Sequence, residues 1–266
     1  MKKILGKLCY LTILITTIFG CQKEEMVTIE NSVAYSISSS HTGNKYNLQI
    51  LYPEDYDPSI GYQTIYLLDG DWYFNELADV VKLKYPSEII LIGIGYKSGN
   101  KRNTDYSYPA DDFLSNSGGG KNYIQFLNNE LIPFIENDLS IKSSETTICG
   151  HSLGGYFALY QLFQQDHPSP FDNIITASPS LFWSEAYLLD LENQYSNIND
   201  TLNKKLFNTI GDLEGVTMNT MFDAFNKKIK SSNYTGLSFD YVRFYNTSHN
   251  NNPIKSFSKG ISFILN

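Results

Sequence analysis

The residues with the clearest chemical potential form the run GHSLG at 150–154. The apolar run 146–149 precedes it and the helix-compatible run 153–165 follows it, so the sequence predicts a strand, a sharp turn and a helix. Such a turn lifts Ser152 to its tip, at the N-terminus of the helix, where the positive end of the helix dipole lies. The pattern predicts a serine nucleophile that attacks an acyl carbon.

Each part of this turn has a physical requirement. A Cβ at Gly150 or Gly154 would make the strand and the helix collide, so both positions favour glycine. The Leu153 amide is free to donate to an oxyanion formed on the attacked carbonyl. The alternative is a glycine-rich turn in which Ser152 only caps the helix. Cys149 lies inside the apolar strand, where we expect an inert core thiol and no competing nucleophile.

A serine nucleophile of this type needs a histidine base and an acid, in the chain order Ser, acid, His. Of the four His residues, His249 comes directly after the last predicted strand, where a loop can carry it over the serine. Asp212 and Glu214 both follow the preceding strand. The longer arm of Glu214 favours it as the acid, and Asp212 is the alternative, otherwise interpreted as a turn former or helix cap.

The oxyanion needs a second backbone donor, normally from the loop after the third strand of the sheet. Here the run 66–72 reads YLLDGDW, and Gly70 would let the chain turn so that the Asp71 amide faces the substrate. The alternative is an ordinary β–α turn with an Asp-Gly signature.

The elements that must position these residues alternate between strand-like and helix-like runs. This alternation predicts an α/β fold with a mostly parallel sheet, helices on both faces and an antiparallel pair of edge strands at the N-terminal end. In such sheets the chemistry collects at the carboxyl ends of the strands. The predicted strands are 33–38, 46–52, 64–68, 89–94, 146–149, 173–176, 206–210 and 239–245, and the predicted helices are 73–83, 123–137, 153–165, 185–195, 218–230 and 254–265.

The N-terminal segment is interpreted as a targeting signal and not as part of the folded domain. Residues 1–20 have a basic start and a short apolar run, as in a secretory signal. They end in Ile18-Phe19-Gly20 before Cys21, a pattern that resembles the lipobox of bacterial lipoproteins. We therefore expect lipid on Cys21, a tether over 21–32, one catalytic domain over 33–266, and a place in the cell envelope, held to a membrane by the lipid. Plain secretion and an uncleaved membrane anchor are the alternatives.

Composition excludes several classes of protein. The chain of 266 residues is 42% hydrophobic and carries a formal charge of −8, which argues against a nucleic-acid partner. If Cys9 leaves with the signal and Cys21 carries lipid, Cys149 remains the single thiol of the domain, so no intramolecular disulfide is expected. No Cys-x-x-Cys or His-Glu-x-x-His spacing is present, so neither a metal nor another cofactor is expected.

A set of motifs resembles one family. The runs that carry the resemblance are YPEDYDP at 52–58, IYLLDGDWYF at 65–74, IGIGY at 92–96, Arg102 with Asp105-Tyr106, ELIPFIE at 130–136, ICGHSLGGYFALY at 148–160, ASPSLFW at 177–183 and GDLEG at 211–215. Together they resemble the putative-esterase group of the α/β-hydrolases, which includes siderophore esterases of the enterobactin-hydrolase type, S-formylglutathione hydrolases, feruloyl and acetylxylan esterases and mycolyltransferase antigens.

The resemblance implies Ser152 as nucleophile, His249 as base and Glu214 as acid, with the amides of Asp71 and Leu153 as oxyanion donors. It also implies that Trp72, Arg102 and His151 contact the substrate. For Arg102 a second interpretation stays open, a surface salt bridge to Asp105.

The expected function is hydrolysis of a carboxylic ester through an acyl-enzyme, without a large lid over the site. The substrate is expected to be a small-molecule or oligosaccharide ester: a siderophore ester such as an enterobactin-like trilactone, or a feruloyl or acetyl ester on a plant polysaccharide. An acyltransferase is the enzymatic alternative. A ligand-binding lipoprotein on a hydrolase scaffold is the non-enzymatic one.

Overall fold

The structure is a computed structural model, and it describes residues 29–97 and 99–266. The predicted signal over 1–20, the lipidated Cys21 and most of the tether over 21–32 lie outside the described residues. Within the described part of the chain, no helix is long and apolar enough to cross a membrane.

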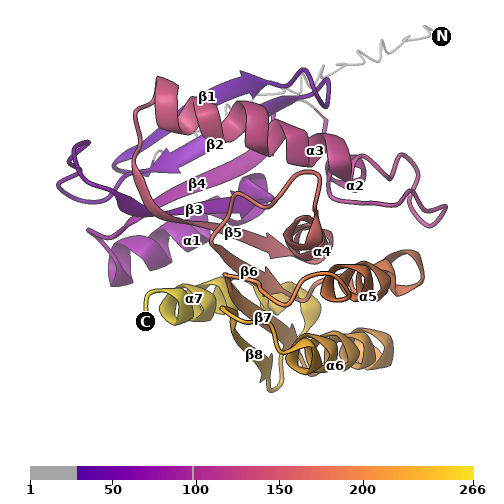
Figure 1. The fold of residues 1–266 in the computed structure, drawn as a ribbon. Coiled ribbons are helices and arrows are strands. Elements are labelled where there is room, and N and C mark those ends of the chain that lie inside the picture. The colour runs from indigo at the N-terminus through magenta and orange to yellow at the C-terminus, as the bar shows by residue number, and fades with distance from the viewer. Residues whose placement is uncertain (1–28, 98) are drawn as a thin grey trace, which may run out of the picture.

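Eight strands form one sheet in the order β1-β2-β4-β3-β5-β6-β7-β8 (Figure 1). The β1–β2 and β2–β4 pairs are antiparallel, and all pairs from β4 to β8 are parallel. The predicted α/β class and the antiparallel N-terminal edge are confirmed. The strands are Ser32–Ser38 (β1), Lys45–Leu51 (β2), Tyr62–Leu68 (β3), Ile89–Tyr96 (β4), Ser143–His151 (β5), Asn173–Ala177 (β6), Lys205–Gly211 (β7) and Ser238–Phe244 (β8).

Helices cover both faces of the sheet. On one face lie α1 and α7, which contact each other, and on the other lie α3, α4, α5 and α6 (Figure 1). The α-helices are Gly70–Lys84 (α1), Arg102–Asp105 (α2), Gly120–Phe126 (α3), Leu153–Tyr160 (α4), Trp183–Ser196 (α5), Gly215–Ser232 (α6) and Pro253–Ile264 (α7). Short 3-10 turns occupy Gln161–Phe163 and His249–Asn251.

The helix predicted over 123–137 is the element that differs most from the expectation. It is α3 followed by two π-helical segments, Leu127–Leu131 and Phe134–Asp138. Periodicity predicts that a helix exists but cannot distinguish a bond to the fourth residue from one to the fifth. The short α2 was not predicted, because four residues carry no periodic pattern.

The central strands have apolar side chains on both faces, which explains their continuous hydrophobic runs. In β3, Tyr66 points into the core under α3 and α4, whereas Ile65 and Leu67 point into the core under α1 and α7. The helix α1 shows the complementary pattern, with buried residues at the spacing of one helical face: Phe74, Leu77, Ala78 and Val81.

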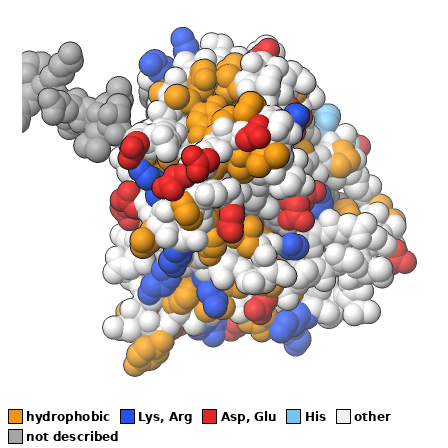
Figure 2. All heavy atoms as spheres, turned by 90° about the vertical axis from the view of Figure 1, so that its left-hand side faces the viewer, with side chains coloured by type: hydrophobic (Ala, Val, Ile, Leu, Met, Phe, Trp, Pro, Cys, Tyr) orange, Lys and Arg blue, Asp and Glu red, His pale blue; other side chains and the backbone are white. Residues whose placement is uncertain are grey.

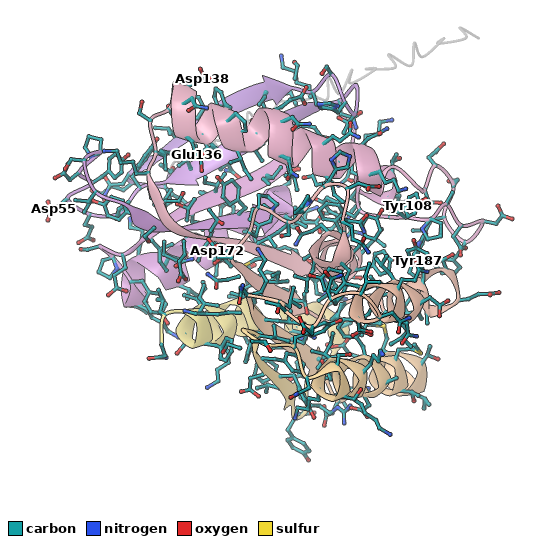
Figure 3. The ribbon with its side chains drawn as sticks, viewed as in Figure 1. Asp55, Tyr108, Glu136, Asp138, Asp172 and Tyr187 are labelled. Carbon is teal, nitrogen blue, oxygen red and sulfur yellow. The ribbon has the colours of Figure 1, made fainter. Side chains whose placement is uncertain are left out.

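The carboxyl ends of the parallel strands meet at one edge of the sheet. In Figure 1 the chain leaves β5 toward α4 on the right, so this edge faces right. Tyr108 and Tyr187 lie on that side in Figure 3, with ring centroids 6.0 Å apart, whereas Asp55 and Asp138 lie on the opposite side. Figure 2 shows the amino-end side, where hydrophobic groups alternate with both signs of charge.

A buried carboxylate lies beneath the loop that follows β4. Asp105 is 1% exposed and accepts hydrogen bonds from the Tyr46 hydroxyl at 2.8 Å and from the Asn44 amide at 3.4 Å. Burial raises the pKa of Asp105 to about 6, although these donors oppose the rise.

This burial predicts a pH-dependent stability. The folded carboxyl of Asp105 binds its proton more tightly than the unfolded one, whose pKa is about 4, so its contribution to the free energy of unfolding falls as the pH rises from about 4 to about 6. In urea unfolding across this range, Asp105→Asn should lose less stability than the wild type, by on the order of 2–3 kcal/mol. The exposed Asp79→Asn serves as the control. Parallel pH curves for wild type and Asp105→Asn would contradict the prediction.

Candidate active site

Ser152 stands at a sharp junction between β5 and α4, as predicted. Its backbone has φ 57° and ψ −118°, a strained conformation for a residue with a side chain. Three backbone bonds hold it: the Ser152 N–H donates to the Ala177 carbonyl at 2.9 Å, and the Ser152 carbonyl accepts from the Tyr156 N–H at 2.9 Å and from the Ser180 N–H at 3.1 Å. The strand–turn–helix context of the motif is confirmed.

The two glycines of the motif serve different contacts. A Cβ at Gly150 would overlap the carbonyl of Gly154, so glycine there allows the strand and the helix to approach. A Cβ at Gly154 would instead press on the carboxylate of Asp69, at 3.3 Å. The sequence predicts that glycine at both positions prevents a collision between the strand and the helix. This prediction is right for Gly150 and wrong for Gly154, where glycine leaves room for the carboxylate of Asp69.

His249 and Glu214 are hydrogen-bonded to each other. The distance from His249 Nδ1 to Glu214 Oε2 is 2.8 Å, and the Glu214 side chain is 1% exposed. The alternative acid, Asp212, accepts a hydrogen bond from the Thr247 N–H at 3.1 Å. Of the two candidates, Glu214 is the one in contact with the imidazole.

The other oxygen of Glu214 is also held. Glu214 Oε1 accepts from the Gly211 N–H at 2.6 Å and from the Ser178 hydroxyl at 2.5 Å, while Asn252 donates to both Ser178 and Glu214. Because Oε1 is saturated with donors, the carboxylate is fixed with Oε2 toward His249.

The predicted base, His249, makes no hydrogen bond to the predicted nucleophile, Ser152. Within residues 29–97 and 99–266, Ser180 is the only residue whose side chain lies within hydrogen-bond distance of the Ser152 hydroxyl, with 3.4 Å between the oxygens. The ring of His151, next to Ser152 in the chain, has its centroid 4.4 Å from that of His249. Catalytic hydrogen bonds are often long before substrate binds, so the lack of a bond between Ser152 and His249 here agrees with a catalytic pair.

The two predicted oxyanion amides stand in the first turns of α1 and α4. N–H groups at these positions have no acceptor within their own helix. The turn before Asp71 is tightly fixed: Asp69 has φ 55°, and a Cβ at Gly70 would come within 2.7 Å of the Gly93 backbone. The Asp71 carboxylate also accepts from the Tyr96 N–H at 2.7 Å, which ties α1 to the end of β4.

Arg102 has a different partner from the one expected. Its Nε and one terminal nitrogen donate to the two carboxylate oxygens of Asp69, each at 3.0 Å, so the salt bridge to Asp105 is wrong. The guanidinium also lies over the ring of Trp72, 5.1 Å from its centroid. Burial raises the pKa of Asp69, and Arg102 opposes that rise. Two of the three guanidinium nitrogens are thus hydrogen-bonded within the protein.

The two other predicted substrate contacts differ in exposure. Trp72 is 52% exposed beside the Asp71 amide, where a ligand can reach it. His151 is 5% exposed, and both of its ring nitrogens have protein partners: Tyr73 at Nδ1 and the His249 carbonyl at Nε2. In the structure the side chain of His151 is therefore engaged by protein groups, and its predicted contact with substrate stays a prediction.

Several site residues were not predicted individually. Ser178 and Ser180 follow β6 at the carboxyl edge, a position that could have marked them as candidates. Asn252 and Tyr73 carry no comparable signal, because their contacts join distant parts of the chain.

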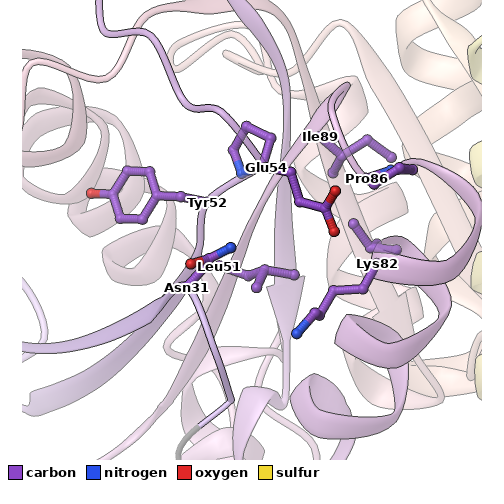
Figure 4. A pocket seen from close by; sticks show the side chains of 9 residues that line it. Asn31, Leu51, Tyr52, Glu54, Lys82, Pro86 and Ile89 are labelled. Atoms are coloured by element: carbon purple, nitrogen blue, oxygen red, sulfur yellow. The ribbon is translucent and has the colours of Figure 1, made fainter.

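Other hollows on the surface are separate from this site. A small cavity is lined by Leu51 at the end of β2, by Lys82 of α1 and by Asn31, Tyr52 and Glu54 outside these elements, and it includes none of the predicted site residues (Figure 4). Among the described residues, no group of three or more His, Cys, Asp or Glu side chains is placed to hold a metal ion.

Comparison with known proteins identifies the family. Residues 39–234 match the family described as "Putative esterase", a match that spans more than half of the chain. The chain belongs to this esterase family. Its α/β-hydrolase fold agrees with that of a solved relative, the BES protein from Bacillus cereus, at a TM-score of 0.81 and 28% identity over 91% of this chain and 97% of that one.

Two curated relatives of this esterase are also similar in sequence. Ferri-bacillibactin esterase BesA of Bacillus subtilis is 28% identical over 200 residues, which cover 67% of this chain and 68% of that protein. Apo-salmochelin esterase of Escherichia coli is 28% identical over 164 residues, which cover 56% of this chain and 51% of that protein. The chain thus matches about half the length of the second relative.

The contact between His249 and Glu214 predicts unequal effects of two substitutions. Glu214→Gln removes the charge that orients and stabilises the imidazolium, so kcat/KM for p-nitrophenyl acetate should fall by about 100-fold or more. Asp212→Asn keeps an oxygen for the Thr247 N–H, so kcat/KM should stay within about threefold of the wild type. Steady-state kinetics on both variants measures this, and the reverse order of effects would assign the acid to Asp212.

Proposed function

We propose that this protein is a serine esterase that hydrolyses carboxylic esters through an acyl-enzyme on Ser152. The observation that carries the proposal is the 2.8 Å bond between His249 and Glu214, formed beside a strained serine at a helix N-terminus. Membership of the esterase family and the names of the relatives support ester hydrolysis as the reaction.

In the first half of the reaction, the Ser152 oxygen attacks the ester carbonyl carbon while His249 Nε2 takes the hydroxyl proton. Glu214 accepts the hydrogen bond from Nδ1–H and stabilises the imidazolium that forms. The negative charge that develops on the carbonyl oxygen is met by the amides of Asp71 and Leu153. The C–O bond to the alcohol breaks, and the alcohol leaves with the proton from His249.

In the second half, water replaces the alcohol. His249 takes a proton from the water molecule, whose oxygen attacks the acyl carbon. The bond from this carbon to Ser152 breaks, and the serine regains its proton as the acid product leaves.

For the substrate we propose a siderophore ester. The two curated relatives are named as esterases of bacillibactin and salmochelin. Exposed aromatic side chains at the carboxyl edge suit a bulky, aromatic ligand: Trp72 at 52%, Phe113 at 74% and Phe182 at 37%. The rings of Phe113 and Phe182 pack edge to face, with centroids 6.5 Å apart.

The nucleophile assignment predicts that Ser152→Ala loses p-nitrophenyl acetate hydrolysis by about 1000-fold or more, because no acyl-enzyme forms. Ser231→Ala, an exposed serine on α6, serves as the matched control and should retain the wild-type rate. Equal rates for Ser152→Ala and the wild type would refute the mechanism.

The substrate assignment needs a direct comparison of classes. Cyclic catecholate trilactones, feruloylated xylan and acetylated xylan should be offered to the wild type and to Ser152→Ala, with products followed by mass spectrometry. A trilactone should give the highest kcat/KM, and addition of a sugar acceptor should yield no acylated sugar. Preference for a xylan ester, or acyl transfer to the sugar, would replace the siderophore proposal with a carbohydrate esterase or an acyltransferase.

We propose further that the protein is exported and held in the cell envelope by lipid on Cys21. The support is the sequence of residues 1–21, a basic and apolar segment that ends in Gly20-Cys21. The full chain expressed in a bacterial host should fractionate with membranes, and Cys21→Ala should not, because hydrocarbon burial supplies the attachment. Membrane association of Cys21→Ala equal to that of the wild type would contradict the lipid anchor.

A further inference from the structure

His151 occupies the variable position of the serine motif, yet both of its ring nitrogens are engaged inside the protein. Its Nδ1 lies 2.9 Å from the Tyr73 hydroxyl, and its Nε2 lies 3.1 Å from the main-chain carbonyl of His249. The Tyr73 ring also packs edge to face on the His151 ring. The last side chain of β5 therefore connects α1 with the loop that carries the base.

The direction of the two hydrogen bonds follows from their partners. A carbonyl oxygen only accepts, so Nε2 of His151 must carry the proton that reaches His249. Burial, with the neighbouring His249, lowers the pKa of His151 to about 3, and burial raises that of Tyr73 to about 12. His151 is therefore neutral near pH 7, and its bare Nδ1 accepts from the Tyr73 hydroxyl.

The loop of His249 is fastened at two places. On the acid side, the Thr247 N–H donates to Asp212, and the Thr247 carbonyl accepts from the Leu213 N–H at 3.1 Å. On the nucleophile side, the bond from His151 is the attachment. His151 is covalently bonded to Ser152, so this second attachment links the backbone of the base to the backbone of the nucleophile through a single residue.

We infer that His151 is a positioning residue, oriented by Tyr73, that fixes the distance between His249 and Ser152. This inference rests on the proposed function, since it assigns the spacing of the proposed nucleophile and base. The chemical reason is that proton transfer depends steeply on geometry, and a displacement of about 1 Å can lower a rate about 100-fold.

The neutral state of His151 serves the same purpose. When His249 takes the serine proton it becomes a cation, with its ring centroid 4.4 Å from that of His151. A charged neighbour at this distance would oppose protonation of the base, whereas a neutral ring does not. The residue thus holds the loop without adding a charge to the site.

Three variants and one control test the inference with p-nitrophenyl acetate. Tyr73→Phe keeps the ring packing and removes only the donor to Nδ1, which frees His151 to adopt the other tautomer; we expect kcat to fall about 3- to 10-fold at unchanged KM. His151→Leu removes both bonds, and kcat should fall about 10- to 100-fold at unchanged KM. His151→Gln places an amide N–H near the position of Nε2 and should recover most of the lost kcat.

The control is Tyr234→Phe, which removes the hydrogen bond from a hydroxyl that follows α6 to the buried Glu192 of α5. It should lower the melting temperature and leave kcat unchanged, which separates loss of stability from loss of positioning. If His151→Leu does not fold, Tyr73→Phe decides the question.

Two results would overturn the inference. Unchanged kcat in both Tyr73→Phe and His151→Leu, or in Tyr73→Phe alone if His151→Leu does not fold, would show that the contact does not position the base. A rise in KM alone in the His151 variants would return His151 to the role of a substrate contact. Failure of the proposed function itself looks different, because Ser152→Ala would then hydrolyse the ester as fast as the wild type.

Discussion

The close backbone approach between Gly150 and Gly154 is the constraint on which the rest of the site depends. Because no Cβ intervenes, the chain reverses from β5 into α4 within one residue, and Ser152 takes the positive φ that results. Such a conformation costs about 1–3 kcal/mol and persists only where neighbours hold it. Here the end of β6 does so, through the Ala177 carbonyl and the N–H of Ser180, which donates to the Ser152 carbonyl.

Two buried carboxylates stand close to this turn, and each is compensated by its own partners. Asp69 lies against Gly154 and has the bidentate guanidinium of Arg102, while Glu214 has three donors on one oxygen and His249 on the other. A buried charge without such partners would be costly, so the partners must keep their positions for the fold to remain stable. The oxyanion turn and the acid loop are thereby made rigid by the same chemistry.

The sequence predicted the features that depend on local pattern. The strand–turn–helix context of Ser152, the place of His249 after the last strand and the acid pair after β7 all follow from residues adjacent in the chain. What it could not predict are contacts between distant segments. Arg102 has Asp69 as its partner rather than Asp105, and His151 turns inward to His249, because the packing of loops at the sheet edge decides both. The π-helical segments were not predicted for a related reason: hydrophobic spacing does not determine whether an N–H donates to the fourth or to the fifth preceding carbonyl.

The acid and the base of the proposed triad differ in burial, and this difference fits their roles in the reaction. The Glu214 side chain is 1% exposed and saturated with donors, whereas that of His249 is 36% exposed, on a short 3-10 turn. The His249 carbonyl is bonded to His151 and its ring Nδ1 is bonded to Glu214, so Nε2 is the ring atom left to face Ser152. A base that takes a proton from Ser152 and later gives one to the leaving alcohol must adjust to two positions of its partner. A buried acid and a bonded backbone hold the imidazole, so Nε2 is the atom that must serve both partners in turn.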